Sequence, residues 1–323
     1  MSFSADVKNE CARIKNVNVS GVIAELAAYI PMCGALKLTR HGLVLRFNTE
    51  NAAIGRRIFT FLKNFYSGDV DVKVSQSKQL KKNNIYTIAM NDTNAVRVLL
   101  YDTAFVTDDN VFTPNYMPYS VLRTDEEERA YVRASFLGAG SISNPEKYYH
   151  LEFVSSTLDH SHFLQEILSG YGLGAKVTGR KESFITYIKG AEQIADTLAL
   201  MGAQMSVLKF ENIRVLKDVN NNVNRLVNME SANLNKIVNS SVAQVQDIEL
   251  IQQTCGLDTL PEGLRDVAIL RLADESLSLK ELGERLKPPI GKSGVNHRFK
   301  KLRAIANQIR GEHDGYKDSK IEQ

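Results

Sequence analysis

The sequence predicts an α+β protein in which a duplicated αββαββα domain is followed by an all-α helix-turn-helix domain. The first observation is a repeat: the order of helical and extended patterns over residues 20–102 starts again at residue 125. The second is a compact basic segment near the C-terminus whose apolar residues recur at helical spacing. With 323 residues, 43% of them hydrophobic and 24% charged, the chain can bury the cores of two or more domains.

The first repeat shows each element of this pattern in order. We expect a helix over 22–35, strands over 36–38 and 43–47 around a turn at Arg40–His41–Gly42, a helix over 52–66, strands near 70–74 and 85–90, and a helix over 94–101. Residues 103–124 contain Pro114 and Pro118 and are typical of a linker.

The second repeat follows the same order. We expect a helix over 125–138, strands near 141 and over 151–154, a helix over 159–169, strands over 175–178 and 184–188, and a helix over 191–201. Equivalent residues lie 106 positions apart: Gly34 and Gly140, Leu45 and Leu151, Phe47 and Phe153.

Small residues gather in the leading helix of each repeat. They are Ala24, Ala27, Ala28, Cys33 and Gly34 in the first, and Ala130, Ala134, Gly138, Ala139 and Gly140 in the second. Because each sheet needs cover on one face, we expect the two helices to pack closely together at the centre of the domain.

The sequences LAAYIPMCG (26–34) and VRASFLGAG (132–140) resemble the paired helices of LAGLIDADG homing endonucleases. In that family the acidic residue before each final glycine holds the divalent metal that cleavage requires. These positions are Cys33 and Ala139 here. An alanine offers no ligand, and a thiol is too soft for magnesium. The resemblance therefore implies a nuclease scaffold without nuclease activity, and we expect no metal and no cofactor.

Other residues do not replace the lost ligands. Glu25 and the cluster Asp125–Glu128 lie near the starts of the two helices, where acidic residues complement the helix dipole. The histidines, among them His41, His150, His160 and His162, show no metal-ligand spacing. Cys11, Cys33 and Cys255 lack a CxxC pattern and are interpreted as buried thiols.

Charge is distributed unevenly along the chain. The net charge is +3, yet residues 276–310 carry nine cations and two anions, and residues 247–275 carry seven anions and two cations. A basic module of this kind favours a polyanionic partner. A solvated helix face is the alternative interpretation of the charge alone.

The basic module is typical of a helix-turn-helix. We expect helices over 261–273 and 279–286, the latter capped by Ser278 and Glu281, and a third helix capped by Ser293. Val295, Phe299, Leu302 and Ile305 would face the first two helices. The candidate DNA contacts are Lys292, Ser293, Asn296, His297, Arg298, Lys300, Lys301 and Arg303. The turn from Lys287 to Lys292 is longer than usual, and a protein-docking module remains the alternative.

The apolar spacing over residues 203–255 predicts a helical linker. An asparagine-rich stretch predicts a break in it near Asp218–Asn222. Its amide and basic residues suit either DNA contact or simple solvation. We expect domains over 1–202, with repeats at about 20–102 and 125–202, and over 256–310, and a disordered tail over 311–323.

The segments SLKELGERLKPPIGKSGVNHRFKKL (278–302) and NRLVNMESANLNK (224–236) resemble the WhiA family of sporulation and cell-division regulators of Gram-positive bacteria. The resemblance implies a transcription regulator that binds double-stranded promoter DNA and cooperates with RNA polymerase or its sigma factor. Because no signal peptide and no membrane-length apolar run are present, we expect a cytoplasmic, nucleoid-associated protein. The alternatives are an active LAGLIDADG endonuclease and a protein-interaction scaffold.

Overall fold

The computed structural model describes residues 2–15, 18–40, 42–66, 69–76, 83–106 and 117–318. It divides into two compact units, Met1–Asp218 and Val219–Gln323, called unit 1 and unit 2 below. His41 of the predicted turn, residues 107–116 of the predicted linker and residues 319–323 of the predicted tail lie outside the described residues.

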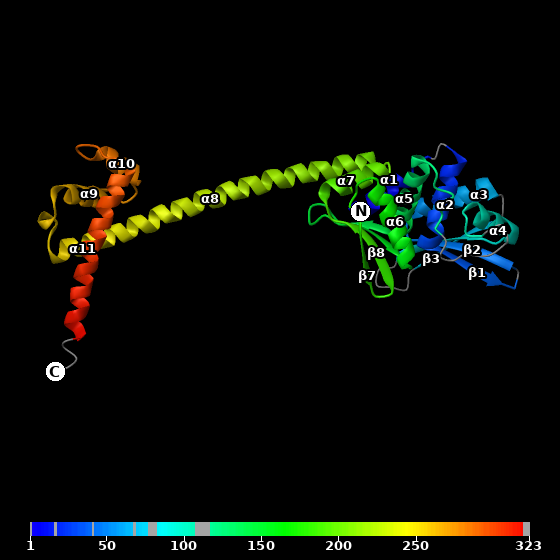
Figure 1. Ribbon diagram of the computed structural model, residues 1–323, viewed down its shortest axis with the longest axis horizontal. Helices are drawn as coiled ribbons and strands as arrows, with labels where there is room; N and C mark the ends of the chain where they lie inside the picture. Colours follow the sequence, from blue (N-terminus) through cyan, green and yellow to red (C-terminus); the bar gives the residue numbers. More distant parts are fainter. Residues whose placement is uncertain are drawn as a thin grey trace. The chain divides into compact units, whose positions relative to one another are not determined.

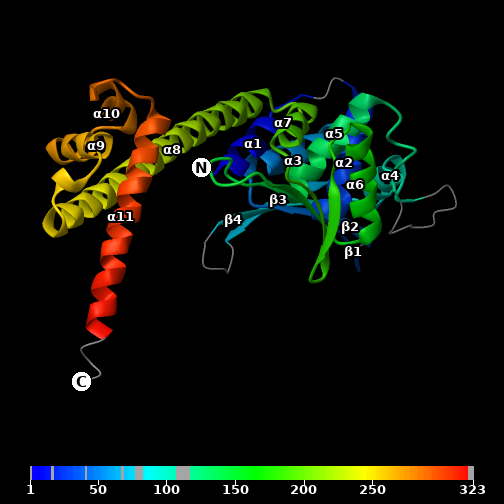
Figure 2. The same cartoon turned by 60° about the vertical axis from the view of Figure 1, so that its left-hand side comes forward.

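Unit 1 contains the two predicted repeats. The first comprises α2 (Val19–Cys33), β1 (Gly34–Thr39), β2 (Gly42–Thr49), α3 (Ala52–Tyr66), β3 (Val70–Gln76), β4 (Asn84–Met90) and α4 (Thr93–Asp102). The second comprises α5 (Asp125–Ala139), β5 (Gly140–Ile142), β6 (Leu151–Ser155), α6 (Leu158–Gly170), β7 (Lys176–Arg180), β8 (Ser183–Ile188) and α7 (Ala191–Leu200). The helices lie on one side of the strands (Figures 1 and 2).

The two antiparallel sheets are built alike. Their strand orders are β1-β2-β4-β3 and β5-β6-β8-β7. Gly34 pairs with Phe47 in the first sheet, and Gly140 pairs with Phe153 in the second, so the register repeats at the offset of 106 found in the sequence. The predicted α+β fold with a duplicated αββαββα domain is confirmed.

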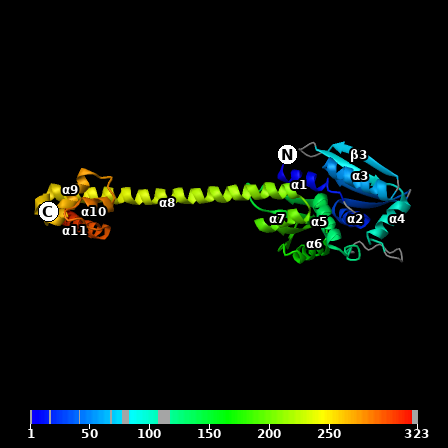
Figure 3. The same cartoon turned by 90° about the horizontal axis from the view of Figure 1, so that it is seen from above.

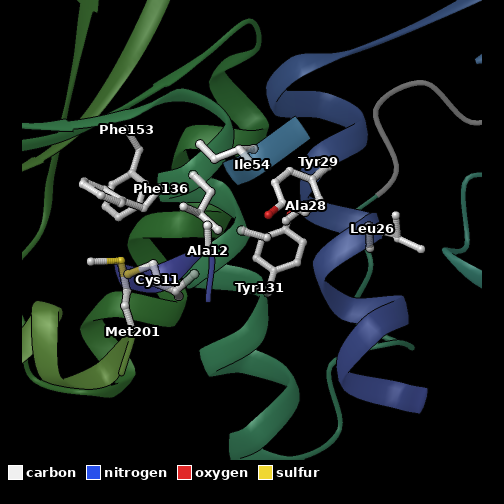
Figure 4. Close-up of a cluster of buried hydrophobic side chains, with 14 of the residues drawn as sticks. Cys11, Ala12, Leu26, Ala28, Tyr29, Ile54, Tyr131, Phe136, Phe153 and Met201 are labelled. Atoms are coloured by element: carbon white, nitrogen blue, oxygen red, sulfur yellow. The ribbon is translucent and has the colours of Figure 1, made fainter. Parts of the chain in front are cut away.

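The leading helices α2 and α5 pack side by side at the centre of unit 1 (Figures 3 and 4). Ala27, Ala28, Ala130 and Ala134 are fully buried. A Cβ atom at Gly138 would lie 2.7 Å from Cβ of Met32 on the opposing helix. The small residues therefore allow the close approach of the two helices that the sequence predicted.

A first helix, α1 (Phe3–Cys11), was not predicted. Its nine residues are largely polar, and its apolar positions are too few for a clear periodicity. In the structure Phe3, Val7 and Cys11 enter the core of unit 1. Glu10 accepts hydrogen bonds from the backbone N–H groups of Met205 and Ser206, at 2.8 and 2.9 Å. Helix α1 thus holds the start of the long helix that follows the second repeat.

That long helix, α8 (Gln204–Thr254), is continuous. The predicted break at Asp218–Asn222 is wrong: asparagine costs only about 0.5 kcal/mol per residue relative to alanine, which lowers helix stability without ending a helix. The division between the two units falls within α8, after Asp218.

Unit 2 continues with η1 (Leu257–Thr259), α9 (Glu262–Ala273), α10 (Leu279–Arg285) and α11 (Lys292–Asp318). Residues 311–318 of the predicted disordered tail therefore form the end of α11. Ile248 and Ile251 of α8 share a core with the three C-terminal helices. None of the helices in the described ranges combines the length and hydropathy needed to cross a bilayer.

Candidate nucleic-acid interface

Helices α9, α10 and α11 form the predicted helix-turn-helix core. Val295, Phe299 and Leu302 of α11 are buried, as are Val267 of α9 and Leu282 of α10. The stripe on α11 was predicted from its spacing, and it extends beyond the predicted residues to Ala306 and Ile309. One side of α11 is therefore occupied by the core, which leaves the opposite side for a ligand.

The turn between α10 and α11 depends on Gly283. The backbone N–H of Ile290 donates to the carbonyl of Gly283 at 3.0 Å, and a Cβ atom at Gly283 would lie 2.2 Å from the Ile290 carbonyl oxygen. Ser278 and Glu281 form the predicted capping box at the start of α10. The hydrogen bond between Ile290 and Gly283 holds the long turn from Leu286 to Gly291 against α10. The length of the turn therefore does not separate α10 from α11.

The start of α11 differs from the prediction. The helix begins at Lys292, and the backbone N–H groups of Gly294 and Val295 bond to the carbonyl of Gly291. Ser293 therefore lies inside the first turn rather than at the cap. Its side chain is exposed and remains among the candidate contacts.

The structure brings most candidate DNA contacts to the open side of α11. Those with exposed side chains are Lys292, Ser293, Asn296, His297, Lys300, Lys301 and Arg303. They combine cations, which suit phosphate oxygens, with amide, imidazole and hydroxyl groups, which suit base edges. A polar face on a helix is the type of surface that helix-turn-helix proteins place in a major groove.

Two of the predicted arginine contacts are held by the protein itself. Arg298 is half-buried, and its Nη1 donates to the carbonyl of Gly263 in α9 at 3.0 Å. Nε of Arg303 lies 4.0 Å from Oδ2 of Asp247 in α8. Arg310 binds the same carboxylate at 2.6 Å. Arg298 therefore serves the packing of α11 on α9, which its place in the sequence did not reveal.

Arg271 is a second structural arginine whose role the sequence did not show. It is 2% exposed and donates to the carbonyls of Glu275 and Leu277, at 3.0 and 2.6 Å. Its Nε also donates to Oε1 of Gln244 in α8 at 3.1 Å. This side chain therefore joins α8 to the α9–α10 turn. Its position in the apolar stripe of α9 was the available signal.

The other candidate site lies at the ends of α2 and α5, where the resemblance to LAGLIDADG endonucleases places the metal ligands of that family. Burial raises the pKa of the Cys33 thiol to about 12, so the side chain is a neutral thiol at physiological pH. Ala139 occupies the equivalent position in α5. Across the described residues, no three His, Cys, Asp or Glu side chains are grouped as metal ligands would be.

The sequence suggested that Glu25 complements the dipole of α2. The structure gives this residue a different role. It is fully buried and binds Nη2 and Nε of Arg57, at 2.6 and 2.7 Å, and Nε of Arg133, at 3.0 Å. Arg57 comes from α3 and Arg133 from α5. The carboxylate is therefore the centre of an ion network that joins the two repeats.

The acidic cluster at the start of α5 fits the predicted helix-terminal role. Glu127 completes a capping box with Thr124. Asp125 binds Arg129 at 2.7 Å, and both Asp125 and Glu128 accept from the hydroxyl of Tyr171. These carboxylates are engaged in local structure.

Three family models match successive parts of the chain. They describe the WhiA N-terminal LAGLIDADG-like domain (residues 20–106), the WhiA LAGLIDADG-like domain (128–220) and the WhiA C-terminal HTH domain (223–306). Proteins named probable cell division protein WhiA are 45% identical in Clostridium botulinum strain Hall and in Clostridium perfringens strain SM101. Each alignment covers 96% of this chain and 99% of the relative.

A solved structure also matches over nearly the whole length. The full-length DUF199/WhiA protein from Thermatoga maritima is 27% identical, with a TM-score of 0.57. The match covers 95% of this chain and 99% of that chain. The order of two LAGLIDADG-like repeats and a helix-turn-helix is therefore common to these proteins.

Proposed function

The chain belongs to the WhiA family, and on that premise we propose that it is a sequence-specific regulator of transcription that binds promoter DNA through α11. The relatives are named as probable cell division proteins, which supports genes of division or sporulation as targets. We further propose that it acts with RNA polymerase or its sigma factor, in the cytoplasm and at the nucleoid.

The observation that carries this proposal is the separation of the two sides of α11. Val295, Phe299 and Leu302 are buried on one side, whereas Asn296 and Lys300 are exposed on the other. Affinity would come from phosphate neutralisation by the lysines, and base selection from Asn296, His297 and Ser293.

Footprinting of the full chain on genomic fragments tests the proposal. Lys300→Ala with Lys301→Ala should weaken binding to all DNA, whereas Asn296→Ala should relax base preference and leave non-specific affinity unchanged. Lys63→Ala with Arg97→Ala, two exposed cations of unit 1, is the matched control for lost charge. Unchanged binding by both α11 variants would refute the assignment.

We also propose that unit 1 does not cleave DNA. An alanine and a neutral thiol stand where cleavage needs two oxygen ligands for magnesium. Supercoiled plasmid should remain intact with the full chain and magnesium. Nicking that is abolished by a substitution confined to α2 or α5 would instead support the endonuclease alternative.

A further inference from the structure

A cavity of about 440 Å³ lies in unit 1 beside α3, away from the seam between α2 and α5. It is bounded by the chain that leaves α1, by the start of α2 and by one side of α3. Four cations line it, Arg13, Lys15, Arg56 and Arg57, and no carboxylate is among the lining residues. Its volume is in the range that small-molecule sites occupy.

Three of these cations, Arg13, Lys15 and Arg56, have exposed side chains. Arg57 is neutralised by Glu25 behind the cavity wall, and its Nη1 donates to the carbonyls of Ala12 (3.2 Å) and Ile14, which fixes that wall. By contrast, no ion pair among the described residues involves Arg13, Lys15 or Arg56. The cavity therefore presents three exposed cations to an anion, beside a wall that the hydrogen bonds of Arg57 fix.

Apart from Thr60 and Asn64, the remaining wall is apolar and aromatic. Phe61 lies under the guanidinium of Arg57, 4.8 Å from ring centroid to Cζ, and Phe65 is 43% exposed beside the cavity. An exposed ring next to exposed arginines suits a ligand that has both a flat apolar part and an anionic part.

The second repeat builds the same corner without these groups. At the offset of 106, Arg56 corresponds to His162, Arg57 to Phe163 and Thr60 to Glu166. Glu166 accepts a hydrogen bond from the hydroxyl of Tyr119 at 2.8 Å. Because the fold forms here with an aromatic residue and a carboxylate, it does not require the cations of the first repeat.

We propose that this cavity binds a nucleotide. Arg13, Lys15 and Arg56 would hold the phosphates, and the base would lie against the exposed ring of Phe65. Duplex DNA does not suit the site, because a cavity of about 440 Å³ has the size of small-molecule sites rather than that of a groove for a duplex. A small soluble ligand is therefore the occupant that the geometry favours.

Isothermal titration calorimetry of the full chain tests this with ATP and GTP as probes, and with adenosine and inorganic triphosphate as the two halves of ATP. We expect a nucleotide to bind more tightly than either half. Arg13→Ala with Arg56→Ala should weaken it at least tenfold, and Lys63→Ala with Arg97→Ala should not. Thermal unfolding of each variant establishes that it is folded.

Three results would overturn the proposal. One is the absence of any binding heat when ATP or GTP is titrated to about 1 mM. Another is equal affinity for the wild type and the Arg13→Ala, Arg56→Ala variant. The third is loss of DNA binding by that variant without any nucleotide binding, which would assign the cations to DNA. Azido-ATP crosslinking to the peptide that contains Asn64 and Phe65 would independently support the site.

Discussion

Glu25 of α2 and Arg133 of α5 form an ion pair of 3.0 Å across the seam between the two repeats, with side chains that are 0% and 9% exposed. Arg57 completes the network. At the offset of 106, Glu25 and Arg57 correspond to Tyr131 and Phe163, whose rings make an edge contact with centroids 5.4 Å apart. One repeat therefore has an ion pair where the other has an aromatic pair, and the repeats are no longer interchangeable at their interface.

Glu25→Ala should destabilise unit 1 by about 3–5 kcal/mol, because two buried arginines would lose their common partner. Urea unfolding followed by circular dichroism measures this. The exposed Glu126→Ala on α5 is the control and should change stability by less than about 1 kcal/mol. A triple change of Glu25, Arg57 and Arg133 to apolar residues should lower the unfolding free energy less than Glu25→Ala alone, because it leaves no buried charge unpaired. A larger loss would mean that the ion network stabilises the seam more than apolar packing can.

Gly138→Ala should cost about 1–3 kcal/mol, because the new methyl group would lie 2.7 Å from Cβ of Met32. Gly170→Ala is the control, since nothing lies within 4 Å of a Cβ atom there. Met32→Gly removes the Cβ atom that the new methyl group would meet, so combined with Gly138→Ala it should be more stable than the sum of the single changes predicts. Additive costs in thermal unfolding would show that the two helices are not in this contact.

Acid should destabilise unit 1 through His160. Burial lowers the pKa of this imidazole to about 4, and its nitrogens bond to the hydroxyls of Tyr131 and Ser155, at 2.8 and 3.0 Å. The unfolded chain takes up a proton below about pH 6.5 while the folded chain does not, so stability falls as pH decreases from about 6.5 to about 4. The contribution should be about 2 kcal/mol between about pH 7.5 and about pH 5.

Stability measured across this pH range in His160→Gln should show a shallower loss than in the wild type. His162→Gln, on the exposed side of the same helix, should leave the loss unchanged. Equal pH dependence of the wild type and His160→Gln would contradict the role of the buried ring.

The three thiols should differ in reactivity. Burial raises the pKa of Cys11 and of Cys33 to about 12, so at about pH 8 only roughly one in ten thousand of each is the reactive thiolate. Cys255 is exposed. A thiol-reactive chromophore should therefore modify one cysteine rapidly in the folded chain and three in urea, and Cys255→Ser should remove the rapid phase. Rapid modification of Cys33 would mean that the seam opens.

Substitutions on α11 should separate DNA contact from packing. Lys300→Ala should make the dependence of log affinity on log salt shallower by about one, as expected for one lost phosphate contact. Arg298→Ala should instead lower the unfolding free energy by about 1–2 kcal/mol, because its bond to the Gly263 carbonyl is lost. A shallower salt dependence with unchanged stability in Arg298→Ala would instead support Arg298 as a phosphate contact.

Much of the fold followed from local patterns. The offset of 106 predicted two sheets of the same register, and the capping box at Ser278 marked a helix start that the structure confirms. Residues Val295 and Phe299 revealed the buried side of α11, and so its exposed side. These features depend on periodicity and capping within a few residues, which a single sequence records.

The sequence by itself determined the duplicated fold, the lost acidic positions Cys33 and Ala139, and the basic helix that follows. Only the tertiary structure decided that Glu25 is the buried centre of an ion network, that Arg298 bonds to α9, and that Arg13 and Arg56 line the same cavity. The physical reason is distance along the chain: Glu25 and Arg133 are 108 residues apart. The sequence pattern around a charged helix residue is the same whether its side chain contacts water, a backbone carbonyl or an oppositely charged side chain. Only the packing of the folded chain distinguishes these surroundings.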